Sequence, residues 1–132
     1  MPATFQKIRA RDHIGRAVTG KSFAVGCAVK DTGAQIGVPR QVDECAAGGR
    51  ADYVVMEEVT PTTGSIWMAG TQVAYLRLGA TVDASNRDQG LAVIDAQGRW
   101  GPPSMGDKVY YVALDLGAAD EYVLARPVCA EA

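Results

Sequence analysis

The sequence has little histidine and cysteine, no long apolar run and no excess of positive charge. It has one histidine, His13, and three widely spaced cysteines with no Cys-x-x-Cys pair, which leaves little material for a zinc site. No apolar run approaches the roughly 20 residues that a membrane-spanning helix needs. The 13 basic and 15 acidic residues leave a formal net charge of −2. A protein that binds nucleic acid mainly through phosphate contacts is strongly basic, so we expect neither a nucleic-acid nor a membrane partner.

What is present fits one soluble globular domain. The chain has 132 residues, of which 48% are hydrophobic and 21% charged, enough for a single ordinary core. The amino-terminal residues contain no apolar segment like that of a secretory signal, so we expect free thiols in a reducing compartment. Cys27 lies in an apolar run and is expected to be buried, whereas Cys45 and Cys129 lie in a loop or tail, where thiols can be exposed.

Turn residues divide the chain into short segments, which favours an all-β fold. The 15 glycines and 6 prolines separate runs that are rich in Val, Ile, Tyr and Thr. Strands are expected at residues 23–29, 35–38, 52–59, 71–78, 91–95, 108–114 and 121–128. Within 71–78, alternation places Tyr75 on one face and Leu76 on the other. Turns spaced in this way predict a small β-barrel or β-sandwich.

The segments between these strands predict particular connections. Residues 31–33 (Asp-Thr-Gly) are expected to end the first strand, and residues 42–50 to form a loop. Residues 83–90 have room for one helical turn, and residues 96–98 form a tight hairpin-like connection. Pro127 cannot donate a ladder hydrogen bond, which suggests that the last strand lies at a sheet edge.

Residues 1–20 look least like part of the core, because they contain few large apolar side chains. Asp12 is the one acidic residue at this end of the chain. The basic residues there are Lys7, Arg9, Arg11, Arg16 and Lys21. We therefore expect an extended amino-terminal arm over residues 1–20 and a single β domain over residues 21–132.

One segment matches a chemical motif letter for letter. Gly15–Ser22 fits G-x-x-x-x-G-K-[ST], the phosphate loop, in which backbone N–H groups cradle phosphates, the lysine reaches them and the hydroxyl meets Mg²⁺. On this interpretation the nucleotide-binding residues would be Gly15, Gly20, Lys21 and Ser22. Asp95, at the end of an apolar segment, would be the metal-binding acid.

The surroundings of the motif favour coincidence. A phosphate loop follows a buried strand and opens a helix, but charged residues precede this motif and the Val-rich run 23–29 follows it. The chain also offers almost no helices to cover a parallel sheet. A small nucleotide-binding protein is therefore kept as the alternative.

Other residue patterns give no catalytic constellation. Glu57 and Glu58 are adjacent in a predicted strand, so their side chains point to opposite faces. Trp67, Trp100, Tyr75, Tyr110 and Tyr111 could stack nucleic-acid bases, but the acidic overall charge favours packing instead. We expect a protein that is not an enzyme, with no cofactor and no metal.

Three segments carry a resemblance to a known family. They are Gly79–Val82 (Gly-Ala-Thr-Val), Gly90–Asp95 (Gly-Leu-Ala-Val-Ile-Asp) and Gly106–Tyr111 (Gly-Asp-Lys-Val-Tyr-Tyr). Their succession resembles the small head decoration, or cement, proteins of tailed bacteriophages, over residues 23–128. Members have a β-rich fold and no catalytic residues.

The resemblance implies a function as well as a fold. The protein would be made in the bacterial host cytoplasm and would stabilise the capsid shell on the surface of the virion. Its partners would be the major capsid protein and copies of itself, forming a trimer. In such proteins extended termini often hold the subunit on the capsid lattice, a role that the basic arm would suit.

Overall fold

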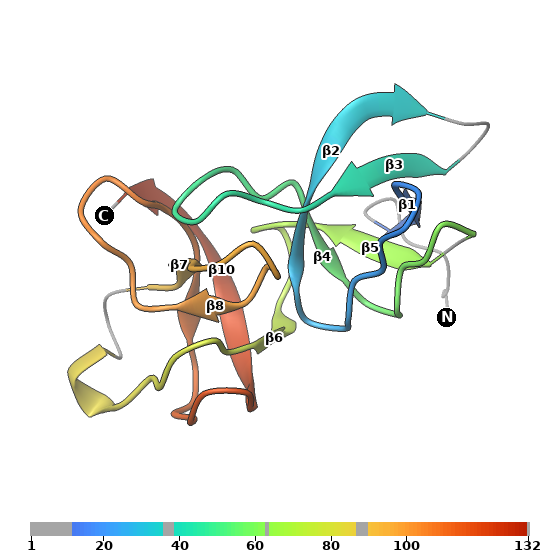
Figure 1. The fold of residues 1–132 in the computed structure, drawn as a ribbon. Helices are drawn as coiled ribbons and strands as arrows, with labels where there is room; N and C mark the ends of the chain where they lie inside the picture. The colour runs from blue at the N-terminus through green and yellow to red at the C-terminus, as the bar shows by residue number, and fades with distance from the viewer. Residues whose placement is uncertain (1–11, 36–38, 63, 87–89, 132) are drawn as a thin grey trace, which may run out of the picture.

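Ten β-strands and one short 3₁₀ helix make up the part of the chain that the computed structural model describes, residues 12–35, 39–62, 64–86 and 90–131 (Figure 1). The strands are β1 (Asp12–Ala17), β2 (Ala28–Gln35), β3 (Arg40–Asp43), β4 (Tyr53–Val55), β5 (Ser65–Met68), β6 (Ala74–Arg77), β7 (Ala92–Val93), β8 (Trp100–Gly101), β9 (Lys108–Ala113) and β10 (Tyr122–Glu131), and the helix is η1 (Ala84–Asn86). The predicted all-β class is confirmed.

The first five strands close into a barrel in the order β1-β3-β2-β4-β5. Closure depends on β1, which pairs in parallel with β3 and antiparallel with β5, where Asp12 lies opposite Trp67. The barrel core is built mainly from short and β-branched side chains, which pack well on a pleated surface. It consists of Ala17, Phe23, Val29, Val42, Tyr53, Val55, Val59 and Ile66.

The last five strands form an open arrangement beside the barrel. β6, β10 and β9 make a three-stranded antiparallel sheet in that order, and β7 pairs with β8 as a hairpin. The rings of Trp100 and Tyr111 meet edge to face, with centroids 5.4 Å apart, at the centre of this core. The Trp100 indole N–H donates to the carbonyl of Gly26 at 3.1 Å and so connects this core to the turn before β2.

A close backbone contact fixes the hairpin against the barrel. Ala28 N–H donates to the carbonyl of Gly98 at 2.8 Å. A Cβ on Gly98 would collide with the backbone of Ala28, and Gly98 has a φ of +81°. This site therefore accepts only glycine without strain.

The local predictions are confirmed at several connections and wrong at others. The 96–98 connection joins β7 to β8, and η1 lies within residues 83–90. However, β2 continues through residues 31–33, because it pairs with β3 on both sides of a register shift, at Asp31 and again at Gln35. β3 occupies the start of the predicted loop 42–50, and β5 lies in a segment for which no strand was expected.

The barrel begins earlier than the predicted domain boundary at residue 20. Asp12–Ala17 form β1, so this part of the expected arm is a barrel strand; residues 1–11 lie outside the described residues. The charges that made the segment look like an arm are compatible with a strand, because a barrel strand turns alternate side chains outward.

The last strand is central in its sheet, so the edge position suggested by Pro127 is wrong for β10 as a whole. β6 pairs with β10 only as far as Ala125, and beyond it β10 has β9 alone as a neighbour. Pro127 lies in that one-sided stretch, at a register shift before Ala130, where a missing N–H breaks no ladder on the β6 side.

Candidate interaction surface

The glycines of the phosphate-loop motif have separate structural roles. Gly15 lies in β1, where a Cβ would meet the Ile66 side chain at 2.9 Å, so barrel packing requires a glycine. Gly20 lies in the turn that follows, with a φ of +86°, the conformation that a type II turn uses.

Four backbone N–H groups of the motif are bonded to protein carbonyls. The donors are Gly15, Ala17, Val18 and Lys21, and the acceptors are Gly64, Thr60, Val42 and Val18 in turn, at 2.9 to 3.1 Å. After Ser22 the chain passes through a bridge between Phe23 and Val59 and then into β2, so no helix opens at the motif. The motif therefore lacks the helix N-terminus at which a phosphate loop holds its ligand.

Acidic neighbours neutralise the lysine of the motif. Lys21 Nζ lies 2.8 Å from Asp43 Oδ1 and 3.7 Å from Glu44 Oε1, and the hydrogen bond to Asp43 raises the pKa of Lys21. Asp95, the expected metal-binding acid, is held by Arg99 Nε at 2.9 Å. An open hollow of about 300 Å³ beside Lys21 is also lined by Glu44, whose carboxylate disfavours an anionic ligand.

The cysteines do not form a reactive site in the described part of the chain. Cys27 is buried, as predicted, but Cys45 is buried too, so its suggested exposure is wrong. Burial raises the pKa of the Cys45 thiol to about 12, which keeps it protonated and unreactive. The side chain of Cys129 lies outside the described residues. Among the described residues, no three His, Cys, Asp or Glu side chains gather to hold a metal ion.

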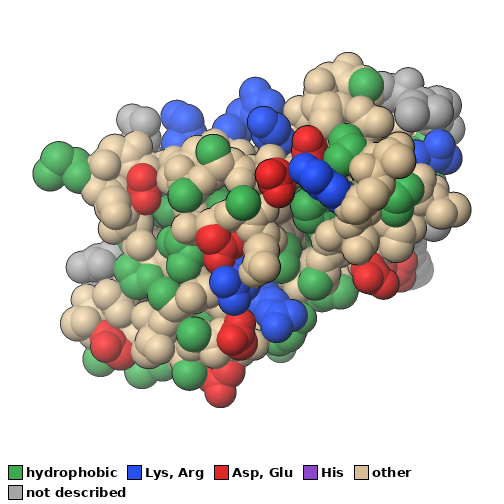
Figure 2. Space-filling view, viewed as in Figure 1, with side chains coloured by type: hydrophobic (Ala, Val, Ile, Leu, Met, Phe, Trp, Pro, Cys, Tyr) green, Lys and Arg blue, Asp and Glu red, His purple; other side chains and the backbone are tan. Residues whose placement is uncertain are grey.

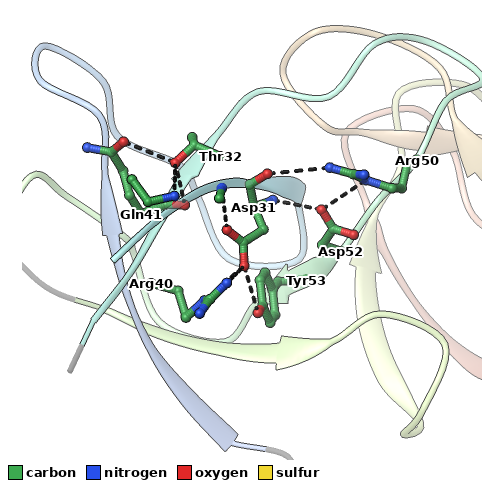
Figure 3. A network of polar contacts seen from close by, with 9 residues as sticks. Asp31, Thr32, Arg40, Gln41, Arg50, Asp52 and Tyr53 are labelled. Atoms are coloured by element: carbon green, nitrogen blue, oxygen red, sulfur yellow. Dashed lines mark hydrogen bonds and ion pairs between the residues drawn. The ribbon is translucent and has the colours of Figure 1, made fainter. Parts of the chain in front are cut away.

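A polar network on the barrel wall fastens β2, β3 and β4 together (Figure 3). Asp31 Oδ2 accepts hydrogen bonds from Arg40 Nε and Nη2 at 2.9 and 2.6 Å and from the Tyr53 hydroxyl at 3.2 Å. Asp31 N–H donates to Asp52 Oδ2 at 2.7 Å, and Asp52 pairs with Arg50 at 3.1 Å.

The charge of the Asp31 carboxylate is tied to these contacts. Burial opposes its ionisation, but hydrogen bonds from Gly33 and Arg40 outweigh burial and lower the pKa of Asp31. Burial and the neighbouring Asp31 raise the pKa of Tyr53. The contacts of Asp31 join three barrel strands, so the network stabilises the fold.

The outer face of the β6-β10-β9 sheet carries exposed apolar side chains. Tyr75 lies opposite Leu124, and Leu114 N–H donates to the carbonyl of Leu124 at 2.8 Å, so these three residues form a row across the sheet. The exposed fractions are 63% for Tyr75 and 48% for Leu114. The exposed fractions of Val73 and Tyr122 are 49% and 46%. We call this surface the sheet face.

The strands of the sheet face contribute basic side chains, of which Arg77 lies 4.0 Å from the Asp120 carboxylate in the turn before β10. The outward positions of β6 and of the described part of β10 include Arg77 and Arg126 and no carboxylate. The Arg77 guanidinium lies 5.9 Å from the centre of the Tyr122 ring. Tyrosine and arginine among aliphatic side chains are typical of protein interfaces. Elsewhere, as Figure 2 shows for one view, charges of both signs are scattered and form no broad patch of one sign.

An apolar hollow of about 140 Å³ opens at the junction of the barrel and the sheet face. Its lining residues are Val25, Val54, Val55, Met56, Trp67, Ala74 and Tyr75. Tyr75 therefore belongs to both the hollow and the sheet face, which makes them one continuous apolar surface.

Most of this surface was not singled out from the sequence. The alternation in residues 71–78 was the available signal, because it put the apolar Tyr75 on the face opposite to Leu76, and Leu76 is fully buried. Trp100 and Tyr111 are buried as packing residues, as expected. The hollow could not be foreseen, because its walls come from the turn before β2 and from β4, β5 and β6.

Comparisons with known proteins identify the fold. No protein-family model and no curated protein matches the chain. Among solved structures, the N base of the head fiber gp8.5 of bacteriophage phi29 matches with a TM-score of 0.70, at 13% sequence identity, over 92% of this chain and 96% of that chain. The two chains share a fold along almost their whole length. A phage-head protein has this fold, as the resemblance seen in the sequence implied.

Proposed function

We propose that this protein is a non-enzymatic structural protein of a phage virion that binds the capsid shell and stabilises it. The observation that carries the proposal is the fold shared with a phage head fiber base over 92% of the chain. The finer parts of the proposal are a decoration, or cement, role, contacts with the major capsid protein, and self-association as a trimer. Production in the bacterial host cytoplasm and the anchoring role of residues 1–20 belong to the same proposal.

The surface chemistry supports a protein partner over a small-molecule substrate. The sheet face offers Tyr75, Tyr122 and Leu114 to solvent, and buried aromatic and arginine anchors contribute most to the binding energy of protein interfaces. The phosphate-loop motif, by contrast, has its lysine and four of its backbone N–H groups bonded to protein groups.

The sheet face fits a shell surface that is apolar and acidic. Arg126 is exposed and has no ion pair among the described residues, so an acidic partner would supply its missing charge. We therefore assign the sheet face to the contact with the major capsid protein.

Binding to expanded heads that lack this protein tests the proposal. Co-sedimentation should show saturable binding by the wild-type chain. Arg126→Glu should weaken binding by about tenfold or more, because it places like charges together at the contact. Lys30→Glu, an equal charge reversal on β2, is the matched control and should bind like the wild type. Absence of wild-type binding would reject the proposed function, and equal effects of the two substitutions would reject the assignment of the sheet face.

A further inference from the structure

Met105 is the most exposed large hydrophobic side chain of the described residues. It is 97% exposed, compared with 63% for Tyr75, the next in order. A side chain so fully in water adds nothing to the packing of its own chain. Its apolar surface is therefore available to another molecule, and it lies at the tip of the loop between β8 and β9.

Hydrogen bonds fix the backbone of the turn that carries Met105. Ser104 N–H donates to Asp107 Oδ2 at 2.8 Å, and Asp107 N–H donates to the carbonyl of Ser104 at 3.1 Å, which closes a tight turn. Gly106 supplies the positive φ of +88° that the turn needs. Lys108 N–H then bonds to the carbonyl of Gly48 at 3.2 Å and fixes the base of the loop. An anchor that is ordered before binding loses little entropy on binding.

The apolar hollow has the size and the chemistry to accept a methionine. Its volume is about 140 Å³, and enclosed apolar cavities of about 150 Å³ bind a molecule as large as benzene. A methionine side chain is a slender chain of four heavy atoms. The rings of Trp67 and Tyr75 line the hollow, and thioether sulfur makes favourable contacts with aromatic rings.

Met105 cannot reach the hollow of its own chain. It precedes Lys108, the first residue of β9, whereas Tyr75 is level with Leu114, just beyond the other end of that strand. Six residues of strand separate these levels by about 20 Å. Figure 1 shows the same separation: the loop between β8 and β9 lies at one end of the view, and the turn before β2 lies near its middle.

We propose that Met105 of one copy inserts into the apolar hollow of a second copy, so that copies associate head to tail. The proposal rests on the self-association within the proposed function and names the contact that produces it. The two sides of such a contact are different surfaces, so each copy offers one free Met105 and one free hollow. Repetition of the contact gives a closed ring if the rotation closes, and a filament if it does not.

Two substitutions remove the two sides of the contact separately. Met105→Glu would place a charge in the hollow of the neighbour. Val25→Trp would fill the hollow from its own rim, where Val25 is 38% exposed; Val25→Glu replaces it if the tryptophan lowers the unfolding temperature. Leu116→Glu is the matched control, because Leu116 is an exposed loop residue outside the hollow and the Met105 turn. Circular dichroism and thermal melts should show all variants folded.

Sedimentation velocity on the free protein then decides the proposal. Each of Met105→Glu and Val25→Trp should weaken self-association by about tenfold or more, whereas Leu116→Glu should not. A mixture of the two variants should form a one-to-one heterodimer that grows no further, since it retains one intact Met105 facing one intact hollow. A reciprocal two-fold contact between the same two sites would also keep one intact pair in this mixture, but the wild type would then stop at a dimer, whereas a head-to-tail contact carries the wild type beyond a dimer.

The opposite results would overturn the contact. One such result is unchanged self-association in both single variants, which is expected if the shell protein or residues 1–11 fill the hollow. The other is a mixture of the two variants that stays monomeric. Co-sedimentation with heads is a separate measurement. If the mixture stays monomeric but the wild-type chain still binds heads, the contact is wrong and the proposed function stands.

Discussion

The barrel and the sheet region, which comprises strands β6 to β10, bury their apolar side chains in different ways. The barrel is closed, and its core is made mostly of alanine, valine and isoleucine. The sheet region is open, and its core is centred on Trp100 and Tyr111 with leucines around them. The barrel adds a polar network at Asp31 on its wall, whereas the sheet region leaves Tyr75 and Tyr122 exposed on its outer face.

The closed barrel and the open sheet therefore differ in how much surface they offer to another protein. A closed barrel has no free sheet edge to pair with another protein. An open sheet covers only one of its faces, so its other face is available for contacts. The exposed side chains of Tyr75, Tyr122 and Leu114 accordingly share the outer face of the sheet. The barrel strands expose Ile14 and Met68, and the barrel wall also carries the Asp31 network.

Removal of the largest side chain of the sheet region should have the largest effect. Trp100 is fully buried, contacts Tyr111 and bonds to Gly26. Trp100→Ala should lower the free energy of unfolding by about 3–5 kcal/mol, through lost burial and the cavity that remains. Urea unfolding at neutral pH measures this. Tyr75→Ala, which removes an exposed ring, is the control, and an equal loss in both variants would show that Trp100 does not centre the core.

The junction of the two regions should be the next most sensitive place. Gly98→Ala adds a Cβ against the backbone of Ala28 at a φ of +81°. We expect the free energy of unfolding to fall by about 1–2 kcal/mol because of the left-handed conformation and by a further ~1–3 kcal/mol because of overpacking. Gly33→Ala isolates the first contribution, because Gly33 has a φ of +88° and a Cβ added there would meet nothing within 4 Å. Thermal and urea unfolding that give equal losses for both variants would contradict close packing at the junction.

The barrel network should show a smaller effect that depends on pH. Asp31→Asn should lower the free energy of unfolding at neutral pH by about 1.5–3 kcal/mol, the usual range for hydrogen bonds to charged groups. The pKa of Asp31 is lowered in the folded chain. Its contribution is therefore complete above the unfolded pKa of about 3.9 and is lost as the pH falls through the lower folded value.

The difference between wild type and Asp31→Asn should accordingly shrink as the pH is taken below about 4. Urea midpoints measured from neutral to acid pH follow it. Asp107→Asn is a control, because Asp107 caps a surface turn and takes no part in the network. A difference that is constant with pH would show that the charge of Asp31 contributes nothing.

Local chemistry made part of the fold predictable. Gly98 and its neighbours indicated the β7–β8 hairpin, and the alternation around Tyr75 indicated which side of β6 is buried. The short apolar segments between turns were enough for the all-β class and the choice of a barrel or sandwich.

Non-local pairing made the rest unpredictable. β1 is a strand because it lies between β3 and β5, and its parallel pairing at Gly15 with Arg40 has no local signature. The same holds for the candidate surface. No sequence pattern singled out Met105, and the hollow is assembled from segments that include Val25, Trp67 and Tyr75, far apart along the chain.

The order of the two regions along the chain has a consequence for synthesis. All five barrel strands lie between Asp12 and Met68, so they leave the ribosome before any strand of the sheet region. Until Trp100 and Tyr111 follow, Ala28, Cys45 and Val54 have no cover, because they belong to the core that both regions share. The nascent barrel therefore exposes this apolar flank for the seconds that the remaining residues take to be translated, and the sheet region buries it once it has folded.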